Sequence, residues 1–518
     1  SFTPAQRDAP ALVELIVAGA DPTAGRAATA IAGLGDPGRL AIDARLGREI
    51  EEGAAARLVG ALGLLAKRGD VVARAALLTR MTDRAVRVRR AAAIALGKLG
   101  GDDARAALIA RWDASDVTPD ERRALAEALG KVGGDEAIER LRSLRPAQDA
   151  ELERRRDRAV LMADRSAKRD ADSEIATDVK PPTPLHVRLH CKPGLAELLA
   201  LELPRSLRPV VHDEGSVDVT LDQPWSALFA SRLWSTAGIS IALEPADARN
   251  RPTDPTLASG DAITRAITSP PVRALLAAWT RGPIRWRLAF PQGHKRAVVW
   301  RVARDVAAIA PELVNDPSQT TWDVLVDDKL ASLELVPRRA ADPRFAWRVA
   351  DVPASSHPTV AAALAFVGEA RATDRVWDPF AGSAAELVER ALLGPYRSLV
   401  GTDLSEDALA AARKNLDAAK LTATLTRADA RTHAAGPVDL IITNPPLGSR
   451  VRLDAVTLLV DSLPNFVKQL APGGRIVWIT PATRKTAAVA EALGLKRTRW
   501  MPVDLGGVRG QLERWDRA

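Results

Sequence analysis

The feature that most constrains the fold of this chain is a repeat in its N-terminal part. A segment rich in Ala, Leu and Gly recurs near residues 30, 61, 95 and 128, at offsets of 31, 34 and 33 residues. The last two copies read Ala-Leu-Gly-Lys-Leu-Gly-Gly-Asp and Ala-Leu-Gly-Lys-Val-Gly-Gly-Asp. Each unit predicts two helices, the first ended by a left-handed glycine and the second capped by the aspartate. Units this short cannot bury their apolar faces alone, so we expect them to stack into an α-solenoid.

The repeats resemble HEAT repeats of the short bacterial type over about residues 10–148. This resemblance implies a docking surface whose partner is a protein or a nucleic acid. We therefore expect a HEAT-repeat α-solenoid over residues 1–148 and a charged, Pro-rich linker over 149–184. The linker carries the run Arg154-Arg155-Arg156, which can contact phosphate, but its acidic neighbours favour a solvated helix face.

Composition agrees with a multidomain globular chain. A length of 518 residues predicts about three domains, and 47% apolar with 27% charged residues excludes wholesale disorder. The net charge of +8 permits a polyanionic partner. An arginine-rich, alanine-rich and lysine-poor composition is also what a GC-rich genome encodes, so the charge alone does not decide the question.

The single cysteine, Cys191, excludes an intrachain disulfide framework and a zinc site built from several cysteines. It favours a reducing, cytoplasmic setting, and we expect no metal. No apolar run is long enough to span a membrane, so no membrane partner is expected. The first twenty residues lack the basic region of a signal peptide.

Residues 185–343 predict a second, α+β domain. Residues 186–189, 284–288 and 322–326 alternate like strands, and 195–203 and 300–310 are typical of helices. The order of elements, with the run Cys-Lys-Pro-Gly-Leu-Ala-Glu that starts at Cys191, resembles the THUMP-type domain of RNA-modifying enzymes. The resemblance implies that this THUMP-like domain binds RNA.

From Val376 onward, predicted strands alternate with loops and helices. The expected strands cover residues 376–377, 398–402, 423–426, 438–443 and 475–479, and the chain closes with a predicted hairpin. This alternation predicts a parallel, doubly wound α/β sheet of the Rossmann-like kind, whose ligands bind at the carboxyl ends of the strands. Polar residues stand at those ends: Asp378, Asp403, Asp429 and Asn444.

The loop after the first strand excludes a dinucleotide, because it has one glycine and opens with an acid that repels pyrophosphate. Asp378 can meet an ammonium group, Asp403 can accept two ribose hydroxyls, and Asp429 can accept an adenine amino group. Together these groups describe S-adenosyl-L-methionine, and the domain resembles class I methyltransferases. The predicted cofactor-binding residues here are Asp378, Phe380, Ala381, Gly382, Ser383, Asp403, Leu404, Asp429, Ala430 and Asn444.

The run Asn444-Pro445-Pro446-Leu447 resembles the Asn-Pro-Pro-aromatic motif of amino-group methyltransferases. An exocyclic amine on a base is a poor nucleophile, because its lone pair is delocalised into the ring. The Asn444 side-chain oxygen and the Pro445 carbonyl can accept its two N–H bonds and aim the lone pair at a methyl group. All four residues are predicted to be catalytic. Leu447 stands where the family usually has an aromatic residue, so it offers a base apolar contact without stacking.

The flanks of this core resemble THUMP-containing guanine-N2 methyltransferases of tRNA and rRNA. The segment from Trp347 to Leu364 resembles their interdomain connection, which implies that Thr359 contacts the cofactor. Arg450 matches the Gly-x-Arg continuation of the family motif, and we expect Arg450 and Arg452 to bind substrate. The turn departs from the family's usual Gly-Ser-Gly-Thr, because Ala384 and Ala385 occupy its second half. His357 is expected to be structural.

We therefore expect residues 344–518 to form a class I methyltransferase domain that uses S-adenosyl-L-methionine and forms N2-methylguanosine in structured RNA, with tRNA favoured over rRNA. One alternative is an Asn-Pro-Pro enzyme acting on adenine in DNA or on glutamine in protein. Another is a non-catalytic HEAT scaffold with a degenerate methyltransferase fold, suggested by Leu447 and Ala384.

Overall fold

The computed structural model describes residues 4–19, 22–144, 150–167, 172–243, 255–291, 295–327, 332–353, 355–446, 455–481, 483–506 and 508–518. The chain divides into two compact units. The first comprises Ser1–Ser173, Glu244–Arg273 and Arg281–Thr321, and the second comprises Glu174–Leu243, Ala274–Thr280 and Trp322–Ala518. Among the described residues, no helix has the combination of length and apolar character that a membrane span requires.

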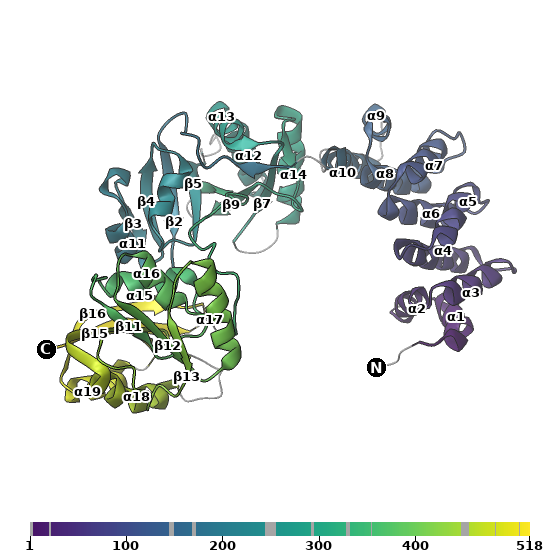
Figure 1. Cartoon of the computed structure of the whole chain (residues 1–518). Coiled ribbons are helices and arrows are strands. Elements are labelled where there is room, and N and C mark those ends of the chain that lie inside the picture. Colours follow the sequence, from purple (N-terminus) through teal and green to yellow (C-terminus); the bar gives the residue numbers. More distant parts are fainter. Residues whose placement is uncertain are drawn as a thin grey trace. The chain divides into compact units, whose positions relative to one another are not determined.

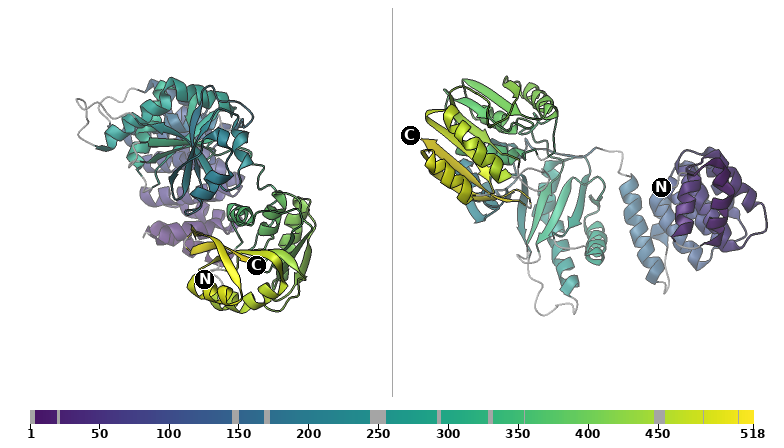
Figure 2. Two further views of the ribbon diagram at one scale, coloured as in Figure 1. Left: turned by 90° about the vertical axis from the view of Figure 1, so that its left-hand side faces the viewer. Right: turned by 90° about the horizontal axis from the view of Figure 1, so that it is seen from below.

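The first unit begins with a stack of helices, coloured purple to blue in Figures 1 and 2. Its α-helices are α1 (Ala9–Ala18), α2 (Thr23–Ala32), α3 (Asp36–Leu46), α4 (Glu52–Lys67), α5 (Val71–Thr79), α6 (Val86–Leu99), α7 (Asp102–Trp112), α8 (Pro119–Val132), α9 (Asp135–Ser143) and α10 (Ala150–Ala167). Short 3-10 turns, η1 (Gln6–Asp8) and η2 (Arg80–Thr82), join them. One continuous apolar core runs through these helices, as stacked short units require.

The repeated glycines of the second, third and fourth units lie in close contact with the helix of the next layer. The pairs are Gly63 with Ala95, Gly97 with Ala128, and Gly130 with Ala159. A Cβ atom placed on Gly97 would lie 2.8 Å from the Ala128 Cα, which is too close for any side chain. Because Ala159 belongs to α10, this helix packs on α8 as a further layer of the array. The acidic neighbours expected to pair with the arginine run are present: Arg154 and Arg155 pair with Glu151, and Arg156 with Asp157.

Glycines end the repeat helices as expected, and the aspartates take a different position. Gly100 ends α6 with a φ of +68°, and Gly133 ends α8 with a φ of +67°. The N-cap of α7 is Gly101, with a φ of +95°, and Asp102 is the first helical residue. The prediction that the aspartate is the cap is therefore wrong by one position. The Asp102 carboxylate still lies in the first helical turn, where its negative charge interacts favourably with the positive end of the helix dipole.

The rest of the first unit contains α12 (Pro255–Thr268), β7 (Ile284–Ala289), α14 (Arg296–Ile309) and β8 (Leu313–Asn315). Strands β7 and β8 pair in parallel, with α14 as their connection. The strand predicted at 284–288 and the helix predicted at 300–310 are therefore present as β7 and α14.

The second unit contains an antiparallel sheet with the order β3-β4-β2-β5-β10-β9. Its strands are β2 (Leu185–His190), β3 (Val210–Asp213), β4 (Ser216–Leu221), β5 (Thr236–Ala242), β9 (Trp322–Asp327) and β10 (Ser332–Pro337). Its short helices are α11 (Ala196–Glu202), η3 (Arg205–Leu207) and η4 (Trp225–Ala230). The bounds of the remaining elements are Glu174–Ile175 for β1, Pro270–Trp279 for α13 and Thr280–Arg281 for β6. The α+β elements predicted for this part of the chain are thus found.

A second sheet in this unit has the order β13-β12-β11-β14-β15-β17-β16. Its strands are β11 (Arg375–Asp378), β12 (Ser398–Asp403), β13 (Thr424–Arg427), β14 (Val438–Thr443), β15 (Leu470–Thr480), β16 (Leu495–Asp504) and β17 (Arg509–Arg517). The first five strands are parallel, and β17 lies antiparallel between β15 and β16. The five predicted strands and the predicted closing hairpin are confirmed. The strand order changes direction at β11, and ligands of doubly wound sheets bind at such a switch point, here where β11 and β14 end.

Helices cover both faces of this sheet, as expected for a doubly wound fold. They are α15 (Pro358–Val367), α16 (Ala385–Leu392), α17 (Glu406–Ala418), α18 (Ala455–Gln469) and α19 (Thr483–Ala492). Figure 1 shows α15 and α16 on the opposite side of the sheet from α18 and α19. A partly buried ion pair of 2.5 Å joins Glu389 of α16 to Arg232, which lies in the segment between η4 and β5.

Candidate active site

The site begins with Asp378, the last residue of β11, whose side chain is fully buried. Its Oδ1 accepts hydrogen bonds from the Phe380 backbone N–H at 3.1 Å and from the Thr443 hydroxyl at 2.7 Å. Within the described part of the chain, its Oδ2 has no hydrogen-bond partner. Burial, reinforced by the nearby charge of Glu386, raises the pKa of Asp378 well above its usual value. Hydrogen bonds to Oδ1 therefore hold the Asp378 carboxyl group in place, and Oδ2 retains its capacity to accept.

The turn after β11 has the tight backbone that its sequence predicts. Gly382 has a φ of +50°, and its N–H donates to the Asp403 Oδ2 at 3.0 Å. Ala384 is also left-handed, with a φ of +66°, although it is not glycine and is completely buried. Left-handed backbone costs an L-residue roughly 1–2 kcal/mol. The loop therefore keeps its shape at Ala384 through the packing around it.

Asp403 ends β12 and stands across the turn from β11. Its Oδ1 accepts the Ser405 N–H at 2.8 Å, while its Oδ2 accepts the Gly382 N–H. Both oxygens are oriented by backbone, and each retains a further lone pair for a ligand hydroxyl. Leu404, the next residue, is 59% exposed and offers an apolar surface beside it.

Asp429 follows β13, and its carboxylate is already engaged. It forms an ion pair of 2.6 Å with Arg431 and accepts the Arg431 N–H, and these bonds hold its pKa below the usual value. Ala430 is buried behind it. An adenine amino group would therefore share the Asp429 carboxylate with Arg431.

Asn444 follows β14, at the strand end next to Asp378. Its Nδ2 donates to the Ser356 hydroxyl at 2.9 Å, and its Oδ1 is shielded and has no hydrogen-bond partner among the residues that the structure describes. Pro445, the next residue, is buried. The predicted residues Leu447, Arg450 and Arg452 lie outside the described part of the chain.

Thr359 and His357 lie at the start of α15. Thr359 is fully buried, and its hydroxyl lies 2.7 Å from the His357 Nδ1. His357 is the N-cap of α15 and accepts the Thr359 N–H. Burial, together with the charges of Lys192, Arg348 and Arg344, lowers the pKa of His357. A neutral, capping imidazole is the structural role predicted for this residue.

Two residues of the site have no counterpart among the predicted ones. Ser356 precedes α15 and donates to Glu386 in the first turn of α16, and both are almost fully buried. Burial raises the pKa of Glu386 to about 7. The available sequence signal was the pair Glu386 and Glu389, which interrupts the apolar face of a short helix that packs on the sheet.

These residues fit the predicted cofactor. A methionine ammonium group needs a buried acceptor, and the open Asp378 Oδ2 is one. The left-handed turn at Gly382 lets the backbone approach a compact ligand. Among the described residues outside its immediate neighbours, the atom nearest to a Cβ placed on Gly382 is the Phe380 carbonyl oxygen, at 3.9 Å. No group of three or more side chains suited to a metal ion occurs among the residues that the structure describes.

The sheet order and this site define a methyltransferase-like α/β fold. Residues 346–511 match the model of the family described as RMKL-like, methyltransferase domain. The chain is 36% identical over 159 residues to a tRNA (guanine(6)-N2)-methyltransferase of Thermus thermophilus, a match covering 29% of this chain and 47% of that protein. It is 31% identical over 134 residues to a tRNA (guanine(10)-N2)-dimethyltransferase of Methanothermobacter thermautotrophicus, covering 25% and 39% of the two chains.

Among solved structures, TrmN from Thermus thermophilus superposes with a TM-score of 0.52 at 25% identity. The superposition covers 64% of this chain and 100% of that one. The chain thus spans less than half the length of the two tRNA methyltransferases matched by sequence, and the whole of the TrmN structure.

Proposed function

We propose that this chain transfers a methyl group from S-adenosyl-L-methionine to the exocyclic N2 of guanine in tRNA, with rRNA as the next substrate to test. The observation that carries the proposal is the pair of unpartnered acceptors, Asn444 Oδ1 and Asp378 Oδ2, at the ends of neighbouring strands. Both lie within residues 346–511, which match the RMKL-like methyltransferase family model, and the chain is similar to two guanine-N2 methyltransferases of tRNA.

Each residue has a separate task in this proposal. Asn444 Oδ1 and the Pro445 carbonyl accept the two N–H bonds of the target amine, which turns its lone pair towards the methyl group. Asp378 holds the cofactor's ammonium group and Asp403 its ribose. The bound cofactor supplies an electrophilic methyl group on a sulfonium ion. The proton released by the amine after transfer goes to solvent.

The remaining predicted contacts belong to the same proposal. They are Thr359, Phe380, Ala381, Gly382, Ser383, Leu404, Asp429 and Ala430 for the cofactor, Pro446 and Leu447 for the base, and Arg450 and Arg452 for the RNA. Thr359 is fully buried, and Phe380 is held against Asp378 through its N–H.

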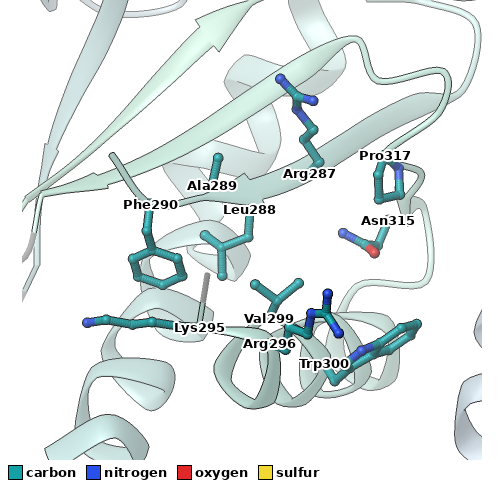
Figure 3. Close-up of a pocket in the computed structure, with 10 residues that line it drawn as sticks. All are labelled: Arg287, Leu288, Ala289, Phe290, Lys295, Arg296, Val299, Trp300, Asn315 and Pro317. Atoms are coloured by element: carbon teal, nitrogen blue, oxygen red, sulfur yellow. The ribbon is translucent and has the colours of Figure 1, made fainter. Parts of the chain in front are cut away.

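The THUMP-like residues 185–343 are proposed to bind the RNA, and a basic cavity of about 540 Å³ in the first unit supports this role. Arg287, Lys295 and Arg296 line it with two aromatic side chains. Figure 3 shows Phe290 and Lys295 at one end and Trp300 at the other. Cationic groups interleaved with aromatic rings suit phosphates and stacked bases.

The helical array, which we propose to be a HEAT-type docking surface, is basic near its last helix. A second cavity, of about 410 Å³, shares Trp300 with the first. The guanidinium group of Arg158, on α10, lies 4.8 Å from the centre of the Trp300 ring. This location favours RNA over protein as what the array contacts at that end.

The test is methyl transfer by the purified full-length chain. We expect tritiated methyl from S-adenosyl-L-methionine to enter tRNA lacking the modification, and mass spectrometry of the nucleosides to show N2-methylguanosine. Asn444→Ala should lose about 10²-fold or more in kcat, because the amine is no longer oriented. Arg413→Ala, on the exposed face of α17, is the control. Methyl in DNA adenine or protein glutamine instead would refute the guanine assignment, and absence of cofactor binding would refute any enzyme.

A further inference from the structure

The candidate catalytic amide of Asn444, which is half-buried, begins a hydrogen-bonded chain that continues through two buried side chains from separate elements, Ser356 and Glu386. Asn444 Nδ2, after β14, donates to Ser356 Oγ at 2.9 Å. Ser356 Oγ, before α15, donates in turn to Glu386 Oε1 on α16. Glu386 is 3% exposed and Ser356 is 9% exposed, so water does not compete with these bonds.

The direction of these hydrogen bonds is fixed at the carboxylate end. An ionised carboxylate only accepts, so the Ser356 hydroxyl hydrogen must point to Glu386. The Ser356 oxygen is then left with lone pairs alone, and only the NH₂ end of the Asn444 amide can face it. The Asn444 Oδ1 must consequently point the other way, where none of the described residues is its hydrogen-bond partner.

From this geometry we propose that Glu386, acting through Ser356, is a positioning residue that sets which end of the Asn444 amide faces the target amine. The inference rests on the proposed function. With Oδ1 facing the amine, the amide accepts an N–H bond. With the amide reversed, its NH₂ group would face the NH₂ group of the base, two donors would oppose each other, and the lone pair would not be directed at the methyl group.

The same geometry makes the orientation depend on the protonation of Glu386. A neutral Glu386 can donate to Ser356 Oγ, and the Ser356 hydroxyl can then donate to a reversed Asn444. The charged groups that act on Glu386 are Arg348, which favours its ionised form, and Glu389 and Asp378, which oppose it. Because the pKa of Glu386 is about 7, the productive orientation should be lost as pH falls through that value.

Kinetics on tRNA provides the first test. We expect Ser356→Ala to lower kcat about 10²-fold, with KM for the cofactor and its calorimetric Kd little changed, and Ser356→Thr to recover most of the loss. The wild-type kcat should fall on the acid side of about pH 7, and Glu386→Gln should remove that limb. Ser462→Ala, a buried serine of α18 that bonds to the Leu458 carbonyl, is the matched control.

A kcat of Ser356→Ala close to wild type, with Asn444→Ala inactive, would overturn the positioning role and leave the proposed function intact. The second test does not depend on activity. The side-chain amide resonances of Asn444, assigned by their loss in Asn444→Ala, should titrate near pH 7 in the wild type and not in Glu386→Gln. Amide resonances that do not titrate would refute the proposal, even in a chain that transfers methyl to tRNA. A titrating amide in a chain without transfer would refute the function alone.

Discussion

Asp378 shows how a single buried side chain can make ligand binding depend on pH. Its pKa is raised by burial and by Glu386, so the neutral form is favoured while no cation is present. A ligand ammonium group favours the ionised form. Binding therefore has to displace a proton whenever the pH lies below the raised pKa.

We predict that the affinity for S-adenosyl-L-methionine rises with pH, by up to about tenfold per pH unit for one proton displaced. Calorimetry from about pH 6 to about pH 9, in two buffers of different ionisation enthalpy, measures both the affinity and the proton released. Asp378→Asn should bind weakly and show little pH dependence. Affinity that stays constant over this range would show that Asp378 is not the group that meets the ammonium.

The sequence predicted which residues gather at the carboxyl ends of the strands, because a parallel sheet places those ends along one edge. The partners of those residues were not. Arg431 occupies the Asp429 carboxylate from only two positions away, and Ser356 reaches Asn444 from a separate loop. Ala384 takes a backbone conformation that its sequence disfavours. Tertiary packing decides the contact of Ser356 and the backbone of Ala384, and residue spacing carries no record of it, whereas the Arg431 pair is a local contact.

At the scale of elements, the array of helices depends on backbone contact between units. Gly97 in α6 faces the backbone of Ala128 in α8, whereas Gly60, on the exposed side of α4, has no atom within 4 Å of the position that a Cβ would take. The two glycines therefore differ in environment while sharing helical conformation. This contrast provides a matched pair of substitutions.

We predict opposite signs for these two substitutions. Gly60→Ala should stabilise the array by roughly 0.5–1 kcal/mol, because alanine restricts the unfolded chain and favours a helix. Gly97→Ala should destabilise it by about 1–3 kcal/mol, because the added methyl group separates α6 from α8. Urea unfolding followed by circular dichroism compares them. Equal effects would show that close packing between the units is not what requires glycine at position 97.

An ion cluster of Glu121, Arg89 and Arg111 connects three helices of the array. Glu121 of α8 accepts bidentate bonds from Arg89 of α6 and from Arg111 of α7, at 2.7–3.0 Å. Desolvation opposes its charge, but the two guanidinium groups outweigh it and lower the pKa of Glu121 from 4.5 to about 2. The cluster thus contributes fully above pH 4.5 and loses its contribution as pH falls towards 2.

We predict that Glu121→Gln destabilises the array by about 3–5 kcal/mol, because it leaves the buried Arg89 without its ion-pair partner, while Arg111 keeps its ion pair with Asp116. The variant should also lose the part of the acid-induced unfolding that lies between pH 4.5 and 2. Melting temperatures measured over this range test both effects, with the exposed pair of Arg413 and Glu406 as the control position. A variant with wild-type stability at neutral pH would contradict the cluster's role.

At the scale of the whole molecule, the net charge of +8 can be tested for its role at one group of basic residues. Arg287, Lys295 and Arg296 gather around one cavity. We predict that Arg287→Ala with Arg296→Ala weakens tRNA binding and lowers the salt slope of log K by about 1 for each phosphate that is no longer neutralised, with kcat at saturating tRNA unchanged. Arg413→Ala is the control. Unchanged affinity at several salt concentrations would exclude this cavity as an RNA-binding surface.

The order of elements was largely predictable, and their assembly was less so. Helical and strand periodicity indicated the α-helical, α+β and α/β parts, since these patterns are local. The antiparallel insertion of β17 and the packing of α10 on α8 depend on distant surfaces. The two compact units also interleave, because residues 244–273 and 281–321 join the first unit while 274–280 join the second.

The pairing of repeat glycines with alanines of the next layer has a consequence for how such a protein lengthens. Gly63, Gly97 and Gly130 each face an alanine of the layer that follows, Ala95, Ala128 and Ala159. A tandem duplication of one copy would therefore dock at both of its junctions without any new residue. Growth and shrinkage by whole copies would preserve the core, whereas an insertion of a few residues inside a copy would misalign every layer beyond it.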